Sequence, residues 1–150
     1  MIDLAKVLPT ILPAAIAWAE AQSRWALSAG AALSQEGITD ARAVGVATPG
    51  RIRVAIVPSL PVPDDSTLRA IALDTGLLGP GMVGLTLGHA IFVVRGQATR
   101  RLLTHEFRHV YQYEVAGSIA AFLPAYLHQI ATVGYHDAPF EVDARRYEIN

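Results

Sequence analysis

Hydrophobic positions at helical spacing recur through most of the chain. Between about 13 and 33 the sequence is rich in alanine, and Trp18 and Trp25 lie seven residues apart on one face. Further along, Thr99 can cap a helix that Gly117 ends, and Pro139 occupies a position where helices favour proline. These patterns predict helices near residues 13–33, 66–76, 99–116, 119–130 and 139–147.

Alternation of apolar and polar residues predicts a small sheet. Ile52, Val54 and Ile56 alternate within a strand over 51–57, and a second β region covers 83–94, where Gly88 indicates a bend or bulge. A break near residues 37–40 separates this part from the N-terminal helix. We therefore predict an α+β fold in a single domain over residues 1–150, with an N-terminal helical segment over 1–36 and a core over 51–150.

The composition narrows the classes of function. The chain has 150 residues, of which 52% are hydrophobic and 17% charged, and its net charge is -1. So few charges exclude a disordered tail, and the absence of a basic excess predicts that nucleic acid is not a partner. Because the chain contains no cysteine, disulfides and thiol chemistry are excluded, and any metal site must use His, Asp or Glu.

An apolar run near the N-terminus raises the question of a membrane. The run from Val7 to Ala19 contains Pro9 and Pro13, and it is shorter than the roughly 20 residues that a spanning helix needs. We expect no stable membrane span, an N-terminal helix that packs on the domain, and a cytoplasmic protein. A cleaved signal peptide and a peripheral association with the membrane are the alternatives.

The helix predicted over 99–116 contains the motif H-E-x-x-H, as His105-Glu106-Phe107-Arg108-His109. Residues i and i+4 lie above one another on a helix, so both imidazoles can reach one metal ion. Glu106 lies beside that line, where a carboxylate can accept a proton from a water molecule that the metal activates. The motif therefore predicts a zinc site with Glu106 as general base.

A site of this kind needs a third protein ligand, and we expect Glu141 to supply it. Pro139 begins the last helix, Glu141 lies in its first turn, and Ala144 follows on the same face, where a small residue permits close helix packing. Asp143 is expected to be a hydrogen-bond partner of a ligating histidine. Other candidates for the third ligand are Asp143, His136, Asp137 and His128.

The motif H-E-x-x-H followed by E-x-x-A resembles the gluzincin-type zincin metallopeptidases, which include a membrane-bound group and the ImmA/IrrE-like group. The resemblance implies a minimal zincin-like fold with His105, His109 and Glu141 as zinc ligands and Glu106 as general base. Those families often place Asp or Asn after the alanine, where this chain has Arg145. Zincins also use a group that stabilises an oxyanion, and Tyr135, His136 and Tyr147 are the candidates for that role.

Residues 85–112 carry a second resemblance, to the DUF4157-type metallopeptidase-like domains. It is carried by Thr86, Gly88 and Ile91 together with the motif and the Val110-x-Gln112 that follows it. The resemblance implies an edge strand before the active-site helix, and the segment from Leu85 to Phe92 is expected to be that edge, along which a peptide can lie.

The sequence thus predicts a zinc-dependent metallopeptidase whose substrate is a peptide or a protein. Other divalent ions, iron among them, fit the same donors. One alternative is a catalytically inactive zincin-fold module that binds metal and acts as a scaffold or interaction domain. A peripheral membrane protein is another. No role is predicted for residues 1–80, and the sequence sets no oligomeric state.

Overall fold

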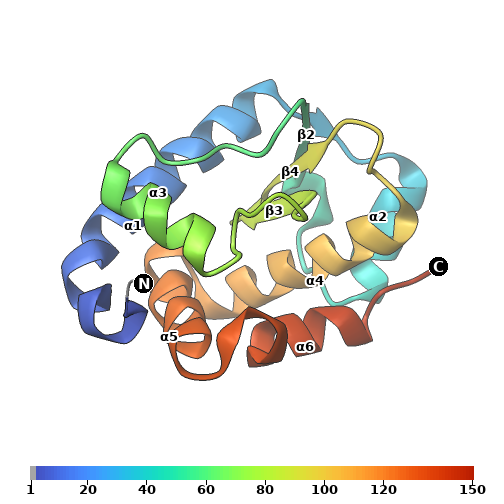
Figure 1. Cartoon of the computed structure of the whole chain (residues 1–150). Coiled ribbons are helices and arrows are strands. Elements are labelled where there is room, and N and C mark those ends of the chain that lie inside the picture. Colours follow the sequence, from blue (N-terminus) through green and yellow to red (C-terminus); the bar gives the residue numbers. More distant parts are fainter. Residues whose placement is uncertain (1–2) are drawn as a thin grey trace.

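Six α-helices and a four-stranded sheet occupy the part of the chain that the structure, a computed structural model, describes, residues 3–150 (Figure 1). This confirms the predicted α+β class. The elements are α1 (Leu4–Ala29), β1 (Ala31–Ala32), α2 (Gln35–Ala43), a 3-10 turn (Pro49–Arg51), β2 (Arg53–Val57), α3 (Ser66–Asp74), β3 (Gly84–Leu87), β4 (Ala90–Val94), α4 (Arg100–Ala116), α5 (Ile119–Asp137) and α6 (Pro139–Arg146).

The strands lie in the order β1-β2-β4-β3. The two central strands, β2 and β4, are parallel, whereas β1 and β3 pair antiparallel with them at the two edges. The region expected over 83–94 is β structure, but at Gly88 the chain reverses instead of only bending, and the region forms a hairpin of two strands, β3 and β4. Gly88 has φ +70°, which allows a two-residue turn between the paired residues Leu87 and Ala90. Of the two hairpin strands, only β3 lies at an edge of the sheet, and Phe92 belongs to the central strand β4.

The N-terminal part also differs from the prediction. The helical segment expected over 1–36 comprises α1 and the start of α2, while residues 1 and 2 lie outside the described residues. Where a break was expected near 37–40, the chain forms α2, since Ser34 accepts a hydrogen bond from the backbone N–H of Gly37 and caps that helix. The strand expected over 51–57 begins only at Arg53, after the 3-10 turn.

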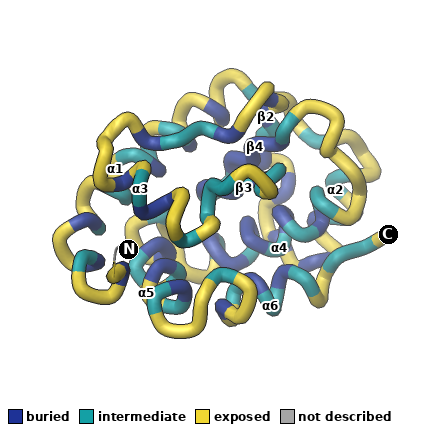
Figure 2. Tube along the Cα trace, viewed as in Figure 1, coloured by how far each residue is buried: buried dark blue, intermediate teal, exposed yellow. Residues whose placement is uncertain are grey.

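Helices cover both faces of the sheet, and alternate residues of β4 supply the two cores. Ile91 and Val93 pack with Phe107 of α4 on one side. Phe92 packs with Ala19 and other residues of α1 on the opposite side. Because β4 is buried from both directions, its residues are hydrophobic at every position rather than at alternate ones (Figure 2).

Helix α1 is long and apolar enough to cross a membrane by length and composition, and it is the one such helix among the described residues. In this structure it packs against β2, β4 and α5. The side chain of Ser23, inside α1, donates a buried hydrogen bond of 2.9 Å to the carbonyl of Leu87. Trp25 stacks on Phe92 at 5.8 Å between ring centroids, although half of Trp25 remains exposed.

Three helices after the sheet bring the candidate site together. Helix α6 lies along α4, and α5 packs against both of them and against α1 (Figure 1). Helix α5 continues past the expected end near residue 130, to Asp137, but Gly134 has φ +83° and interrupts its helical geometry. Pro139 then begins α6, as the sequence predicted.

Candidate metal centre

Helix α4 presents the two histidines of the motif on one face. Thr99 caps the helix by accepting a hydrogen bond from the N–H of Leu102, so the motif falls within regular helical backbone. One turn separates His105 from His109, and their ring centroids are 4.9 Å apart. His109 is buried and His105 is partly exposed.

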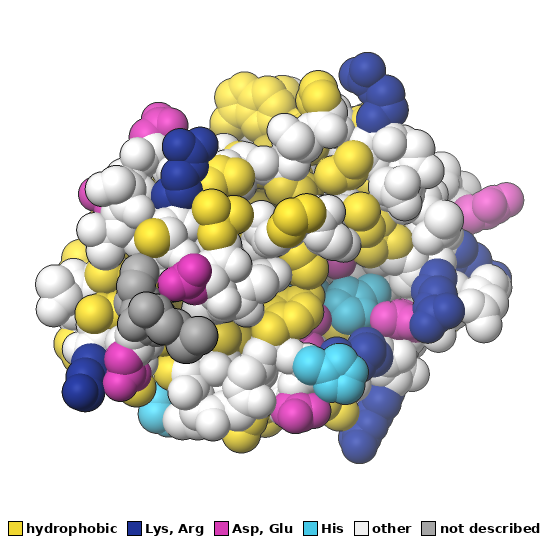
Figure 3. Space-filling view, viewed as in Figure 1, with side chains coloured by type: hydrophobic (Ala, Val, Ile, Leu, Met, Phe, Trp, Pro, Cys, Tyr) yellow, Lys and Arg dark blue, Asp and Glu magenta, His cyan; other side chains and the backbone are white. Residues whose placement is uncertain are grey.

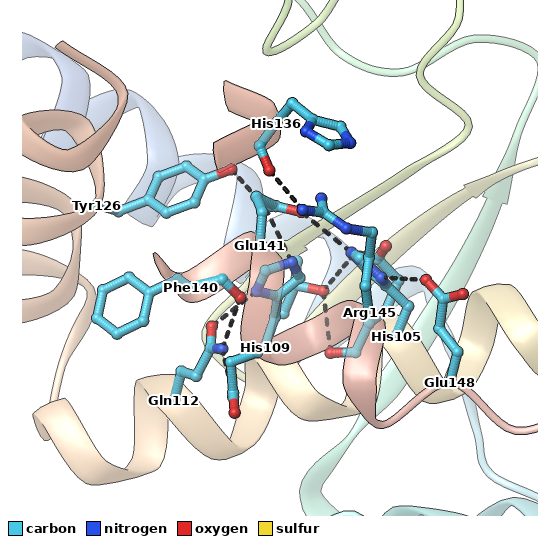
Figure 4. Close-up of polar contacts among 12 residues, drawn as sticks. His105, His109, Gln112, Tyr126, His136, Phe140, Glu141, Arg145 and Glu148 are labelled. Atoms are coloured by element: carbon cyan, nitrogen blue, oxygen red, sulfur yellow. Dashed lines mark hydrogen bonds and ion pairs between the residues drawn. The ribbon is translucent and has the colours of Figure 1, made fainter. Parts of the chain in front are cut away.

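Helix α6 brings Glu141 to the histidines. Ala138 and Ala144 are fully buried on the packed side of this helix, and Glu141 between them is 2% exposed. The Nε2 atom of His105 lies 3.1 Å from Oε1 of Glu141, and Nε2 of His109 lies 3.0 Å from Oε2 (Figure 4). The three predicted ligands are thus side by side, although 32 residues separate Glu141 from the second histidine.

The donor set and its geometry fit a zinc ion. One ligand atom from each of His105, His109 and Glu141 lies within 4.8 Å of the other two. Two imidazoles and one carboxylate, with a further position for water, form the ligand set of catalytic zinc. These donors lie on two packed helices, α4 and α6, so the fold holds them close together in the metal-free protein.

Each histidine uses its other ring nitrogen for a second hydrogen bond. Nδ1 of His105 donates to Oε2 of Glu148 at 2.8 Å, and Nδ1 of His109 donates to Oε1 of Gln112 at the same distance. With the proton held on Nδ1, the lone pair of a neutral imidazole lies on Nε2 and points at the centre of the site. These bonds orient both rings for a metal ion.

Asp143 is connected to His109 through the side chain of Gln112. Its Oδ2 accepts a hydrogen bond of 3.0 Å from Gln112, the same side chain that binds His109. Arg108 donates to both oxygens of Asp143 and to the carbonyl of Val44, which joins α4, α6 and the end of α2. Asp143 therefore fixes Gln112 and does not itself touch a histidine.

Glu106 is buried next to the edge strand β3. The hydroxyl of Thr86 donates to Oε1 of Glu106 at 2.7 Å. The backbone of Gly84 lies so close that a Cβ at this position would come within 2.9 Å of Oε2. Glu106 is 5% exposed and lines the same cavity as His109 and Glu141. The general base predicted from the sequence therefore faces the cluster of ligands.

Two tyrosines of α5 border the cluster. The hydroxyl of Tyr126 donates to Oε2 of Glu141 at 2.7 Å, and Tyr135 lines the cavity beside Glu106 and Glu141. Burial raises the pKa of the Tyr135 hydroxyl far above its ordinary value, and the negative charges of Glu141 and Glu106 raise it further. Tyr135 is consequently a protonated donor at any physiological pH.

The remaining candidates lie away from the cluster. The side chain of His136 is 83% exposed and faces Asp137, its nearest charged partner. The ring of Tyr147 stacks under the Arg108 guanidinium at 3.6 Å and does not face the ligands. Arg145 donates to the backbone carbonyl of His136, which ties α6 to the segment after Gly134 (Figure 4). Of the three oxyanion candidates, only Tyr135 lies in the cavity.

The close contact of these groups shifts their pKa values in opposite directions. Burial lowers the pKa of both histidines, but the hydrogen bonds and negative charge of Glu141 outweigh it, and the pKa of His109 rises to about 9. Burial also opposes ionisation of Glu141, yet the hydrogen bonds from His105 and His109 hold its pKa far below its ordinary value. Without a metal ion, the cluster therefore pairs a carboxylate with imidazolium.

Sequence reasoning missed three residues of the site. Gln112 follows His109 by three positions on the same helix face, a spacing that indicates contact. Tyr126 belongs to the apolar stripe of α5, and only its hydroxyl distinguishes it from a packing residue. Glu148 lies beyond α6 in the C-terminal tail, where no local pattern pointed to His105.

Comparisons with known proteins add no family to this description. No protein-family model matches the chain, and searches of curated proteins and of solved structures found no match.

Proposed function

We propose that this protein is a zinc-dependent hydrolase of the metallopeptidase type that cleaves peptide bonds. The observation that carries the proposal is the convergence of His105, His109 and Glu141, with Glu106 lining the same cavity as His109 and Glu141. A structural metal site needs a complete set of ligands and no base, whereas a carboxylate positioned next to three ligands suits the hydrolysis of a carbonyl compound. Glu106, His109 and Glu141 are buried, and all three line that cavity.

The residues of the chain have separate roles in this proposal. His105, His109 and Glu141 would hold zinc, which supplies a Lewis acid that polarises water and the substrate carbonyl. Thr86 fixes Oε1 of Glu106, so Oε2 is the oxygen that accepts a proton from the attacking water. Glu106 then returns that proton to the amine that leaves.

Tyr135 is the residue best placed to assist at the carbonyl oxygen. Its hydroxyl stays protonated, and it lines the cavity on the side of Glu141. A donor that faces the developing negative charge stabilises a tetrahedral transition state. The contact between Arg145 and the carbonyl of His136 restrains the segment that carries this tyrosine.

The test is a comparison of zinc content and peptide hydrolysis in Glu106→Gln. Because the amide cannot accept the proton, we expect hydrolysis to fall by about a hundredfold or more while zinc stays bound. His105→Ala and Glu141→Ala are expected to lose zinc. Zinc is measured by elemental analysis and hydrolysis with a mixture of peptides of varied sequence.

Glu36→Gln provides the matched control, since Glu36 is exposed on α2 and the same chemical change there leaves the site intact. A wild-type protein that binds no divalent metal would contradict the proposal. So would full activity in Glu106→Gln.

A metal-binding module without activity is the second candidate. Every buried polar side-chain atom among the described residues already has a hydrogen-bond partner, so the cluster is also a self-sufficient structural unit. Zinc binding by the wild type, with no peptide in the mixture cleaved by the wild type or by Glu106→Gln, would favour this candidate.

A further inference from the structure

A cavity of about 120 Å³ extends from the candidate metal centre into the apolar interior. Its polar end is formed by Glu106 and by two of the proposed ligands, His109 and Glu141. Most of the remaining wall is apolar and comes from helices α1, α3 and α5, including Ile11, Ala15, Trp18, Leu68, Ile71 and Leu127. On the face drawn in Figure 3, hydrophobic side chains gather in the middle, next to acidic and histidine side chains.

We propose that this cavity binds a single apolar side chain of the substrate, of the size of leucine or phenylalanine, next to the bond that is cleaved. The inference rests on the proposed function, because it names the substrate class of that same site. A side chain seated in the cavity would place its own backbone at Glu106, His109 and Glu141, since these residues form the polar end of the wall.

The volume sets the size of the occupant. An apolar protein cavity of roughly 150 Å³ binds one benzene molecule. A cavity of about 120 Å³ is of similar size, which matches one isobutyl or phenyl group and no more. A long acyl chain does not fit, and an indole ring would need the walls to move. The site therefore favours a peptide over a lipid.

The charges of the lining residues exclude other side chains. Among the described residues that line the cavity there is no lysine or arginine, and the acidic ones are Glu106 and Glu141. An acidic side chain placed among the apolar walls would be desolvated without a cation in that part of the cavity to pair with. Cleavage beside an apolar residue is the consequence.

This inference gives a role to the first 80 residues. Ile11, Ala15 and Trp18 of α1 and Leu68 of α3 form a wall of the cavity, whereas α4 and α6 carry the chemical groups. The N-terminal part of the chain would thus determine which peptides bind, and the C-terminal part would cleave them.

The first experiment measures binding without hydrolysis. Zinc-loaded Glu106→Gln protein is titrated with peptides that are identical except for one central residue, which is Phe, Leu, Ala, Asp or Lys. Fluorescence of Trp18 reports on binding, in a Trp25→Phe background that removes the second indole. We expect Phe and Leu peptides to bind about tenfold or more tightly than the Ala peptide, with Asp the weakest.

The second experiment fills the cavity. Ala15→Phe places a ring inside it and is expected to abolish the preference for Phe and Leu, while Ala17→Phe, on the exposed side of α1, leaves it unchanged. Leu127→Ala enlarges the cavity and is expected to shift the preference toward a Trp peptide, which keeps the test informative if Ala15→Phe does not fold. Binding of the Trp peptide is measured by calorimetry, because its own indole would overlap the fluorescence of Trp18.

The outcomes separate this inference from the proposed function. Equal binding of all five peptides, or a preference that survives both cavity variants, overturns the inference even if the wild type hydrolyses peptides. Selective binding of Phe and Leu that Ala15→Phe removes supports it, even if the wild type shows no hydrolysis and the proposed function fails.

Discussion

Glu141 illustrates how single residues make this site possible. A carboxylate that is 2% exposed must be compensated inside the protein, and here two imidazoles and the hydroxyl of Tyr126 provide that compensation. Under the proposed function, the same convergence of nitrogen and oxygen atoms would hold a divalent cation in place of the shared protons. Burial, pairing and the proposed metal affinity would then have one physical origin.

Site residues that lie close together in the sequence were easier to predict than those whose contacts join distant segments. His105, Glu106 and His109 were predicted because helix geometry alone places them together. The prediction of Glu141 depended on a second helix, and the positions of Pro139 and Ala144 indicated how that helix packs. Glu148 contacts His105 across 43 residues through an irregular tail, so periodicity carried no signal for it.

Gly84→Ala tests the position of Glu106, the proposed general base, by adding one methyl group next to its carboxylate. The new Cβ would come within 2.9 Å of Oε2 of Glu106 and 3.1 Å of its Cδ, which forces that carboxylate to move away from its partner Thr86. We expect peptide hydrolysis to fall about tenfold or more while zinc content stays at the wild-type level, since a displaced base costs rate and no metal ligand is altered. The measurements are kcat and elemental analysis.

Gly81→Ala is the control for this variant, because nothing lies within 4 Å of a Cβ there. Both substitutions add the same methyl group in the same segment of chain. An equal effect of the two variants, or a loss of zinc in Gly84→Ala, would contradict the placement of Glu106.

At the scale of elements, local signals predicted helices better than strands. The cap Thr99 and the stop at Gly117 bounded α4 correctly. The hairpin was missed because both of its strands are buried and a run of apolar residues conceals the turn, where only Gly88 marks the reversal. Helix α2 differs from the prediction because Gly37 predicts a break, whereas its N–H is the group that Ser34 caps.

Gly30→Ala tests the docking of α1 on the sheet, the feature that separates a packed helix from a leader or membrane segment. A Cβ at this position would meet the carbonyl oxygen of Ala26 at 2.7 Å and backbone atoms of Val54 in β2 at 3.0 Å. Backbone cannot rotate away as a side chain can, so we expect the free energy of unfolding to fall by about 1–3 kcal/mol. Denaturant unfolding measures the change.

Gly50→Ala serves as the comparison, since a Cβ there has open space around it and the change of residue is the same. If Gly30→Ala were as stable as Gly50→Ala, α1 would not pack on β2 as the structure describes, and its role as a wall of the cavity would fail with it.

The metal centre connects several elements of the molecule. Its contacts join α4, α5, α6 and the C-terminal tail through Glu141, Tyr126 and Glu148. Hydrophobic periodicity predicted the fold class, and the H-E-x-x-H motif with Glu141 downstream predicted the region of the site. The strand order and the cavity depend on contacts between segments far apart in the chain, such as α1 with β4, which no local pattern encodes.

These connections predict that zinc and pH act on the stability of the whole molecule together. The pKa of His109 is raised from 6.5 to about 9, so its pairing with Glu141 contributes fully below pH 6.5 and is lost as the pH rises through 9. The metal-free protein is therefore expected to lose stability over that range. Zinc binds the neutral imidazole, so its affinity for the site increases as the pH rises and His109 loses its proton.

The expected result is a zinc-dependent increase in unfolding free energy that grows between pH 6.5 and pH 9. At a free zinc concentration a thousandfold above Kd the increase amounts to about 4 kcal/mol, because zinc binds the folded state and raises its stability by mass action. Denaturant unfolding at fixed free zinc, set by a chelator buffer, measures it at each pH. His136→Ala, which removes an exposed histidine, is expected to keep the wild-type profile, whereas His109→Ala flattens it. An increment that stays constant with pH would mean that His109 gives up no proton to the metal, and a ligand role for this residue would then be excluded.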